Sequence, residues 1–199
     1  MKLVVATKNA HKIHELSEML AIDGLTLVSL ADVGFTGEIE ENGSTFAENA
    51  LIKARAAAKF CGLPALADDS GLCVDALDGA PGIYSARYAS EDGENASDAA
   101  NVEKLLEKLK GIPSGERTAR FVCAIALVLP DGSEKTVTGA CEGVITSEVR
   151  GNGGFGYDPV FYYVPYCKTF GEATEDEKNA VSHRANAVRL IKQELLGLL

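Results

Sequence analysis

The sequence predicts an α/β fold built on a mixed β-sheet. Apolar segments of strand length alternate with amphipathic segments of helix length through the first half of the chain, which is typical of parallel α/β sheets. A long hairpin follows, because the apolar segment 121–129 is joined through Asp131 and Gly132 to a returning segment at 135–146. Antiparallel strands are therefore expected beside parallel ones in the same sheet.

Length and composition restrict the possible functions. A chain of 199 residues is long enough for one well-buried domain or for two small lobes. Its net charge of −10 argues against general binding to nucleic acid polymers, which requires a basic face. There is no apolar run of membrane-spanning length and no secretory signal pattern. The five cysteines are widely spaced and form no C-x-x-C pair, which predicts reduced thiols in a cytoplasmic protein.

A polar segment at 7–12 joins a predicted strand at 3–6 to a predicted helix whose apolar residues begin at Ile13. The first turn of a helix carries unpaired N–H groups and a partial positive charge, which suits a phosphate group. Thr7 and Asn9 add neutral donors, and Lys8 and Lys12 add positive charge. The Walker pattern is absent, so an ATPase is not inferred, and a solvated helix start is the alternative interpretation.

A capping box predicts a helix that begins after Thr45 and continues to about Phe60. The predicted apolar arc of this helix consists of Phe46, Ala50, Ala57 and Phe60. Lys53 falls within that arc, so its side chain must be paired or must reach out to solvent. Two interpretations remain open: Lys53 binds an anionic ligand, or it pairs with a buried carboxylate.

The segment 67–71 places Asp68, Asp69 and Ser70 where a buried strand is expected to end in a glycine turn. Carboxylates in such a position are costly to desolvate unless a positive group meets them, which indicates a metal ion or a catalytic proton. The alternative is a purely structural turn, since Asp, Ser and Gly are common turn residues. An acidic cluster upstream, with Glu40 and Glu41, is either solvated surface or the second part of a divalent-ion site.

Two further segments near the C-terminus indicate binding. The glycine-rich segment 150–159 contains Phe155 and Tyr157, which predicts a binding loop with an aromatic stacking surface. A flexible hairpin loop is the alternative. Ser182 is the predicted N-cap of the last helix, so His183 and Arg184 would lie in its first turn, where positive charges oppose the helix dipole. Such a local conflict often indicates a functional role.

Six motifs, in order along almost the whole chain, resemble the inosine/xanthosine triphosphate pyrophosphatase family. They are T-x-N-x-x-K (7–12), E-E-N-G-S-T-F-x-E-N-A (40–50), A-D-D-S-G-L (67–72), G-A-P-G-I-Y-S-A-R-Y (79–88), G-G-F-G-Y-D-P (153–159) and K-x-x-x-S-H-R (178–184). The resemblance implies hydrolysis of ITP, dITP or XTP to the monophosphate and pyrophosphate with Mg²⁺, which keeps these nucleotides out of nucleic acids. It also implies a homodimer whose chains, residues 1–199, each form one α/β domain with an elongated mixed sheet, flanking helices and two lobes around an active-site cleft.

Residue roles follow from the same resemblance. Asp69 is the implied general base, and it forms the metal site with Glu41, which we prefer, or with Glu40. The residues implied to contact the phosphates are Thr7, Asn9, Lys12, Lys53 and Lys178, with Lys8, Ala10 and His11 in the same loop and Ser70 beside Asp69. Many members of the family carry Gly or Ser where Lys8 stands. The residues implied to contact the base and sugar are Phe155, Gly156, Tyr157, Asp158, His183 and Arg184.

Arg184 suggests a basis for selectivity, because its guanidinium has only donors. Directed at the C6 oxygen of an oxo-purine, it would disfavour the amino group of adenine. Other functions remain open at this stage. One is a pyrophosphatase for dTTP, UTP or modified pyrimidine nucleotides, another is a nucleotide sensor without hydrolysis, and the third is a structural turn with no catalytic role.

Overall fold

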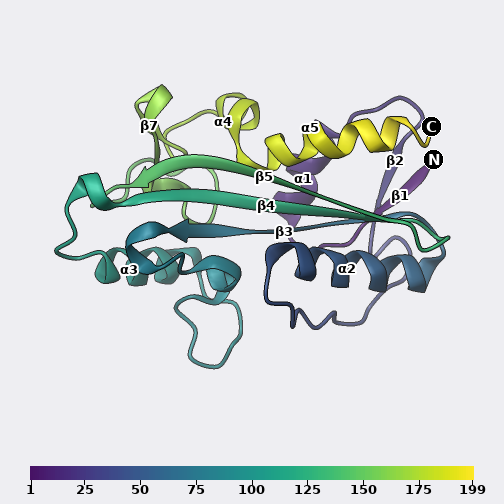
Figure 1. Ribbon diagram of the computed structural model, residues 1–199, viewed down its shortest axis with the longest axis horizontal. Coiled ribbons are helices and arrows are strands. Elements are labelled where there is room, and N and C mark those ends of the chain that lie inside the picture. The colour runs from purple at the N-terminus through teal and green to yellow at the C-terminus, as the bar shows by residue number, and fades with distance from the viewer. The chain divides into compact units, whose positions relative to one another are not determined.

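A computed structural model describes residues 1–199 and shows seven strands in one sheet, in the order β2-β1-β3-β4-β5-β6-β7 (Figure 1). The strands are β1 (Lys2–Val5), β2 (Thr26–Ser29), β3 (Ala65–Val74), β4 (Thr118–Val128), β5 (Glu134–Ile145), β6 (Phe161–Tyr163) and β7 (Lys168–Thr169). The α-helices are α1 (Ala10–Met19), α2 (Phe46–Cys61), α3 (Asp98–Lys108), α4 (Glu175–Val181) and α5 (His183–Leu196).

The sheet is mixed, as the alternating pattern and the hairpin predict. β1 pairs in parallel with β2 and β3, whereas β6 pairs antiparallel with β5 and β7. The chain divides into two compact units, one of residues 1–69, 123–139 and 183–199, the other of residues 70–122 and 140–182. No helix is long and apolar enough to cross a membrane.

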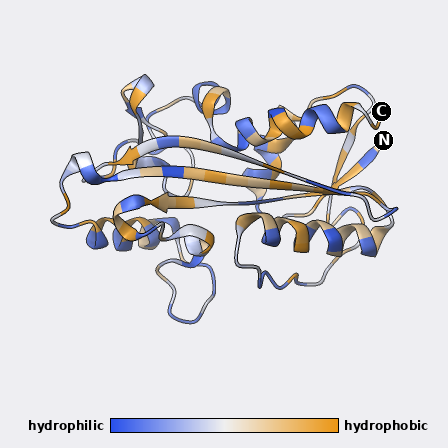
Figure 2. Cartoon of the chain, viewed as in Figure 1, coloured by the Kyte–Doolittle hydropathy of each residue, from blue (hydrophilic) through white to orange (hydrophobic).

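In the first unit, α1 and α5 cover one face of the strands and α2 covers the other (Figure 1). Successive residues of a strand point to opposite faces, so each strand supplies both layers. Leu3 and Val5 pack with α1 and α5, and Val4 packs with α2. Figure 2 shows the long hydrophobic stretch of β4 that lies between such layers.

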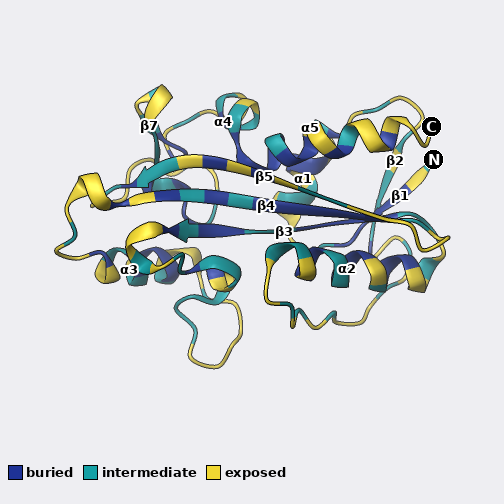
Figure 3. Cartoon of the chain, in the orientation of Figure 1, coloured by how far each residue is buried: buried dark blue, intermediate teal, exposed yellow.

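The layer between α2 and the sheet is built from small residues. Its fully or nearly fully buried alanines are Ala50, Ala54, Ala57 and Ala58 on α2 and Ala65, Ala67, Ala124 and Ala126 on the strands. Figure 3 shows buried and exposed positions alternating along α2. The predicted arc is wrong at Phe60, which is 54% exposed and packs edge-to-face on Phe35. Small side chains let the helix backbone approach the sheet closely, and a phenyl ring does not fit such a layer.

The ends of α2 lie within one residue of their predicted positions. Thr45 caps the first turn by accepting a hydrogen bond from the backbone N–H of Glu48, at 3.1 Å. The reciprocal half of the predicted capping box is absent, because the Glu48 carboxylate instead accepts from the backbone N–H and hydroxyl of Ser44. Gly62 ends the helix in the left-handed conformation, with φ of 66°.

The turn predicted after Ala67 is wrong. β3 continues from Ala65 to Val74, so Asp68, Asp69 and Gly71 lie within the strand. The prediction assumed that adjacent carboxylates end a buried strand because they cannot be desolvated. Each carboxylate instead has charged partners in the folded protein, and Leu72 beyond them is fully buried. The two carboxylates are therefore tolerated inside the strand, and β3 continues to Val74.

The second unit has an aromatic core. Phe121, Phe161 and Phe170 contact one another with ring centroids 4.5–6.2 Å apart, and α3 covers them with Val102 and Leu105. Three elements of this unit were not predicted: β6, β7 and α4. β6 and β7 are too short to show a period, but α4 has a complete capping box between Thr174 and Glu177 that the sequence displays.

The remaining predictions for elements agree with the structure. α3 follows Ser97, which caps it by accepting a hydrogen bond from the backbone N–H of Ala100, and α5 begins at His183, directly after Ser182, which ends α4. All five cysteines are free, and burial raises the pKa of the Cys141 thiol to about 12.

Gly139 of β5 determines how closely α5 approaches the sheet. A Cβ atom at this position would collide with the backbone N of Ala187 and the backbone O of His183. The first turn of α5, which carries His183 and Arg184, therefore packs directly on the backbone of β5.

Gly139→Ala should destabilise the protein by about 1–3 kcal/mol or more, because backbone atoms of α5 must move to admit one methyl group. Gly115→Ala is the matched control, since a Cβ there meets no atom within 4 Å, and it should stay within about 0.5 kcal/mol of the original. Urea unfolding measures both. Equal midpoints for the two variants would contradict the packing described for α5.

Candidate active site

Asp68 and Asp69 are neighbours in β3, and their side chains point to opposite faces of the sheet. Asp68 is fully buried on the side of α1 and α5, with partners on both helices. Asp69 has an exposed side-chain fraction of 13% and its partners lie on α2. The two carboxylates therefore lie in different environments, one on each face of the sheet.

On the α2 face, one lysine joins two carboxylates. The Lys53 Nζ lies 2.8 Å from Glu41 Oε2 and 3.2 Å from Asp69 Oδ1. The side chain of Lys53 is only 10% exposed, and that of Glu41 is 34% exposed. Of the two interpretations left open for Lys53, the structure shows pairing with carboxylates, both of them partly buried, and binding of an anionic ligand stays a prediction.

The environment of Asp69 favours proton acceptance. Burial raises the pKa of its carboxyl group, and the nearby charges of Lys53 and Lys12 offset only part of that effect. Burial also acts to lower the pKa of Lys53, but the negative charges of Asp69 and Glu41 outweigh it and raise the pKa overall. Lys53 is therefore a cation, and Asp69 is a stronger base than an ordinary aspartate.

On the opposite face, Asp68 is the centre of a buried ion-pair network. Its Oδ2 lies 3.0 Å from an Arg184 terminal nitrogen and 3.1 Å from the Lys12 Nζ. Arg184 is 1% exposed and also pairs with Glu15 of α1. Burial acts to lower the pKa of Arg184, but the charge of Asp68 and then that of Glu15 raise it. The guanidinium is thus held between two carboxylates of its own chain.

The α2 face contains more negative than positive groups. Two carboxylates, Glu41 and Asp69, contact one cation, Lys53. With all three ionised, this group has one negative charge in excess. Each oxygen of Asp69 accepts one hydrogen bond, and a carboxylate offers about four lone-pair sites, so acceptor sites remain.

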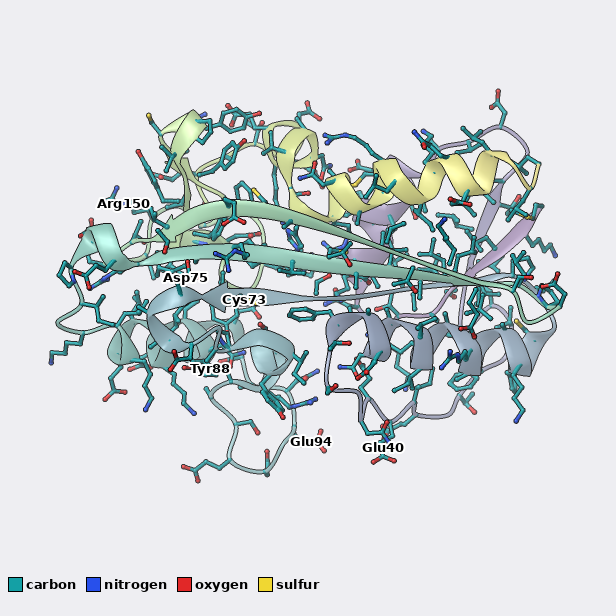
Figure 4. The ribbon with its side chains drawn as sticks, viewed as in Figure 1. Glu40, Cys73, Asp75, Tyr88, Glu94 and Arg150 are labelled. Carbon is teal, nitrogen blue, oxygen red and sulfur yellow. The ribbon has the colours of Figure 1, made fainter.

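The residues that could hold a metal ion are Asp69 and Glu41, since both already share one positive group, the Lys53 ammonium. Oxygen ligands of this kind suit Mg²⁺. Glu40 is exposed and lies on the loop that precedes α2 (Figure 4). In the structure it is Glu41, and not Glu40, that shares a cation with Asp69.

The loop at 7–12 is less open to an anion than its sequence predicts. The Asn9 side-chain oxygen accepts hydrogen bonds from the backbone N–H groups of His11 and Lys12, at 2.9 and 3.2 Å, and so caps α1. Thr7 accepts a hydrogen bond from the backbone of Asn9. Two of the helix N–H groups predicted to be unpaired are therefore satisfied by the chain itself. Lys8, Ala10 and His11 are exposed.

In the second unit, Asp158 orders the glycine-rich loop. Its buried Oδ2 accepts from the backbone N–H of Phe155, at 2.9 Å, and from the Lys178 Nζ, at 2.8 Å. The same Nζ lies 4.5 Å from the centre of the Phe155 ring, a cation–π contact. Gly154 has φ of 69°, and a Cβ there would collide with Asp158. The predicted alternative of a flexible hairpin loop is wrong.

Only one of the two aromatic rings of this loop is partly exposed. Phe155 is half-buried, whereas Tyr157 is 4% exposed, belongs to the core and donates its hydroxyl to the backbone O of Ser85, at 2.8 Å. The stacking surface predicted from both rings is therefore wrong for Tyr157. The backbone N–H of Gly156 is held by Asp98, at 2.6 Å. Burial raises the pKa of Tyr157, so its hydroxyl remains a neutral donor.

The other predicted residues lie on these same elements. Ser70 is half-buried on β3 beside Asp69, and His183 is buried at the start of α5. Sequence reasoning gave no role to Glu15 or Asn49, although both are buried and contact charged members of the network. The signal for Asn49 was its position four residues before Lys53, on the same face of the helix.

Comparison with known proteins gives a consistent result. The Ham1 family model matches residues 3–194. A protein of Desulforamulus reducens called dITP/XTP pyrophosphatase is 55% identical over 190 residues, which cover 95% of this chain and 92% of the relative. A Bacillus subtilis protein with the same name is 51% identical over 192 residues, 96% of each chain. The solved structure of the Staphylococcus aureus Ham1 protein covers 100% of both chains, with a TM-score of 0.89 and 41% identity.

Asp68→Asn should destabilise the protein by about 3–5 kcal/mol, because the buried Arg184 and the partly buried Lys12 lose a charged partner. Glu134→Gln is the matched control, since it removes the charge of an exposed ion pair with Arg55 and should have a much smaller effect. Denaturant unfolding of both variants measures the difference. Equal losses of stability would contradict the central position of Asp68 in the network.

Proposed function

Because the chain belongs to the Ham1 family, we propose that it hydrolyses non-standard purine nucleoside triphosphates, such as dITP, ITP and XTP, to the monophosphate and pyrophosphate. It is a hydrolase of nucleotide metabolism, and removal of these nucleotides keeps them from being incorporated into nucleic acids. The observation that carries this proposal is the shared contact of Asp69 and Glu41 with one cation, Lys53, together with the raised pKa of the Asp69 carboxyl group. The whole chain, residues 1–199, serves as one pyrophosphatase domain.

The donor set supports a requirement for Mg²⁺. Asp69 and Glu41 supply oxygen ligands, their cluster has excess negative charge, and the Lys53 ammonium already occupies a position in contact with both. Glu40 is the alternative second ligand. When bound, Mg²⁺ would neutralise phosphate charge and lower the pKa of a water molecule.

The reaction follows from the chemistry of Asp69. Its carboxylate accepts a proton from water, the water oxygen bonds to the α-phosphorus, and the bond from that phosphorus to the bridging oxygen breaks, so pyrophosphate leaves. Before this step, when the nucleotide binds, Lys12 and Lys53 exchange part of their contact with Asp68 and Asp69 for contact with phosphate oxygens. Catalysis of this kind depends mainly on positioning and charge neutralisation. Thr7, Asn9 and Ser70 supply polar contacts, and Lys178 is assigned to the phosphates as well.

By analogy with the family, we assign recognition of the base and sugar to Phe155, Gly156, Asp158 and His183. Phe155 is held in place by the Lys178 and Asp158 contacts, so the ring is ordered before a ligand binds. Arg184 supplies only donors, which suits an oxo-purine. Asp68 and Glu15 already bind the Arg184 guanidinium. Recognition of the base by Arg184 therefore requires that these two carboxylates hold the guanidinium in the orientation in which it can donate to the base.

Two further features belong to the same proposal. All five thiols are free, which is the state that cysteines keep in a reducing cytoplasm, and we place the protein there. By analogy with its family, the protein is proposed to act as a homodimer.

Hydrolysis assays across dITP, ITP, XTP, dTTP, UTP and ATP, with and without Mg²⁺, test the proposal. Turnover of the oxo-purine nucleotides with Mg²⁺ is expected, and hydrolysis in ¹⁸O-water should place the label in the monophosphate, since the α-phosphorus is attacked. Label found only in pyrophosphate would exclude this mechanism. Preference for dTTP or UTP would favour a pyrimidine pyrophosphatase, and binding without turnover would favour a sensor.

Arg184→Lys should lower the ratio of kcat/KM for ITP to that for ATP by about tenfold or more, because lysine keeps the charge beside Asp68 but loses the planar fork of donors. The folded state is checked by circular dichroism. This substitution is more informative than alanine, which would leave two buried carboxylates without their cation. An unchanged ratio in a folded Arg184→Lys protein would remove Arg184 from base recognition.

A further inference from the structure

Asn49 connects the loop that carries Glu41 to the carboxyl group of Asp69. It lies in the first turn of α2 and is 1% exposed. Its side-chain nitrogen donates to Asp69 Oδ2, at 3.2 Å, and its side-chain oxygen accepts from the backbone N–H of Gly43, at 2.8 Å. Gly43 is two residues beyond Glu41.

The chemistry of the two neighbours determines which way the amide points. The backbone N–H of Gly43 can only donate, and an ionised carboxylate can only accept. The amide oxygen must therefore face Gly43 and the amide nitrogen must face Asp69. Aspartate or leucine at position 49 would lose one or both contacts, so an amide is the side chain that satisfies both.

The loop is held closely against the helix at this point. A Cβ at residue 43 would lie 2.7 Å from the Asn49 side-chain oxygen and 2.8 Å from the Glu48 Cβ. The next residue, Ser44, donates its backbone N–H and hydroxyl to Glu48, at 2.6 and 2.7 Å. Two consecutive loop residues, two and three positions beyond Glu41, are therefore anchored to the first turn of α2.

We infer that Asn49 is a positioning residue that holds the Glu41 loop and the Asp69 carboxyl group in the mutual geometry needed to bind a divalent cation. The inference rests on the proposed function. Asn49 donates to Oδ2 of Asp69, so Oδ1 is the oxygen that contacts Lys53, the lysine shared with Glu41. Groups that hydrogen-bond to metal ligands in this way orient them, and their loss typically lowers metal affinity or activity by about 10- to 100-fold.

The Asn49 side chain joins the backbone of Gly43 to Asp69, and two substitutions break this connection in different ways. Asn49→Ala removes both hydrogen bonds, whereas Gly43→Ala leaves the Asn49 side chain in place and forces the loop away from it. If Asn49 acts by joining the loop to Asp69, the two substitutions should weaken metal binding by similar factors. The double variant should then be little worse than either single one, because both remove the same connection.

Asn101 provides the matched control. It is also a buried asparagine on a helix, 3% exposed, and its amide joins the backbone N–H of Ala89 to the backbone O of Ala86. Asn101→Ala therefore removes a comparable pair of hydrogen bonds from a region without Asp69 or Glu41. Both asparagine variants are expected to unfold at lower temperature than the original protein.

The experiment is a titration of each protein with Mn²⁺, without nucleotide, followed by electron paramagnetic resonance of the free ion. Asn49→Ala and Gly43→Ala should each raise the Kd about 10- to 100-fold, and Asn101→Ala should leave it unchanged. Steady-state kinetics with ITP should show a matching rise in the Mg²⁺ concentration that gives half-maximal rate.

Wild-type affinity in Asn49→Ala, or an equal loss in Asn101→Ala, would overturn the inference. Should Asn49→Ala fail to fold, the Gly43→Ala measurement decides by the same criterion. An unmodified protein that hydrolyses ITP but binds no Mn²⁺ in the titration would also overturn it. An unmodified protein whose Mn²⁺ affinity is weakened by Asn49→Ala, but which hydrolyses no nucleotide, would instead contradict the proposed function alone.

Discussion

The neutralisation of two successive carboxylates within a buried strand is the constraint on which this structure depends. Asp68 and Asp69 have different ion-pair partners, because neighbouring residues of a strand point to opposite faces of the sheet. Each face must therefore supply its own positive charge. Lys12 and Arg184 do so on one side, and Lys53 does so on the other. Removal of any one of these charges would leave an uncompensated ion in a region with little access to water.

This constraint explains the unusual composition of α2. Its alanines let the helix lie close to β3, and that approach brings the Lys53 and Asn49 side chains within hydrogen-bonding distance of Asp69. A layer of larger residues would hold the helix farther from the sheet and separate these groups. The same close packing leaves Asp69 partly desolvated, which raises its pKa and makes it a better proton acceptor. Packing and catalytic chemistry therefore depend on the same small side chains.

In the second unit, paired charges also hold a loop in place. Glycines allow the backbone of 153–156 to turn tightly, and such a segment by itself would be mobile. Asp158, which follows this segment, forms a buried ion pair with Lys178 of α4 and also accepts a hydrogen bond from the backbone of Phe155. The ion pair of Asp158 and Lys178 thus holds the Phe155 ring in one orientation, and each of the two charges is stable in the interior because the other neutralises it. Pre-ordering of this kind reduces the conformational entropy that a ligand must overcome.

The amino-acid sequence alone determined the fold class, the order of the long helices and strands, the hairpin and the family motifs, since these features depend on local periodicity, capping and spacing. It also identified Asp69, Lys53 and Glu41 as members of one acidic and basic group. It could not show that Asp68 and Asp69 remain in a continuous strand, that Phe60 is exposed, or that Asn9 caps its own helix. Nor could it show that Glu15 and Asn49 join the network. Those features depend on which groups from distant parts of the chain meet in the interior, because a buried charge or amide is stable only beside partners that the folded protein brings to it.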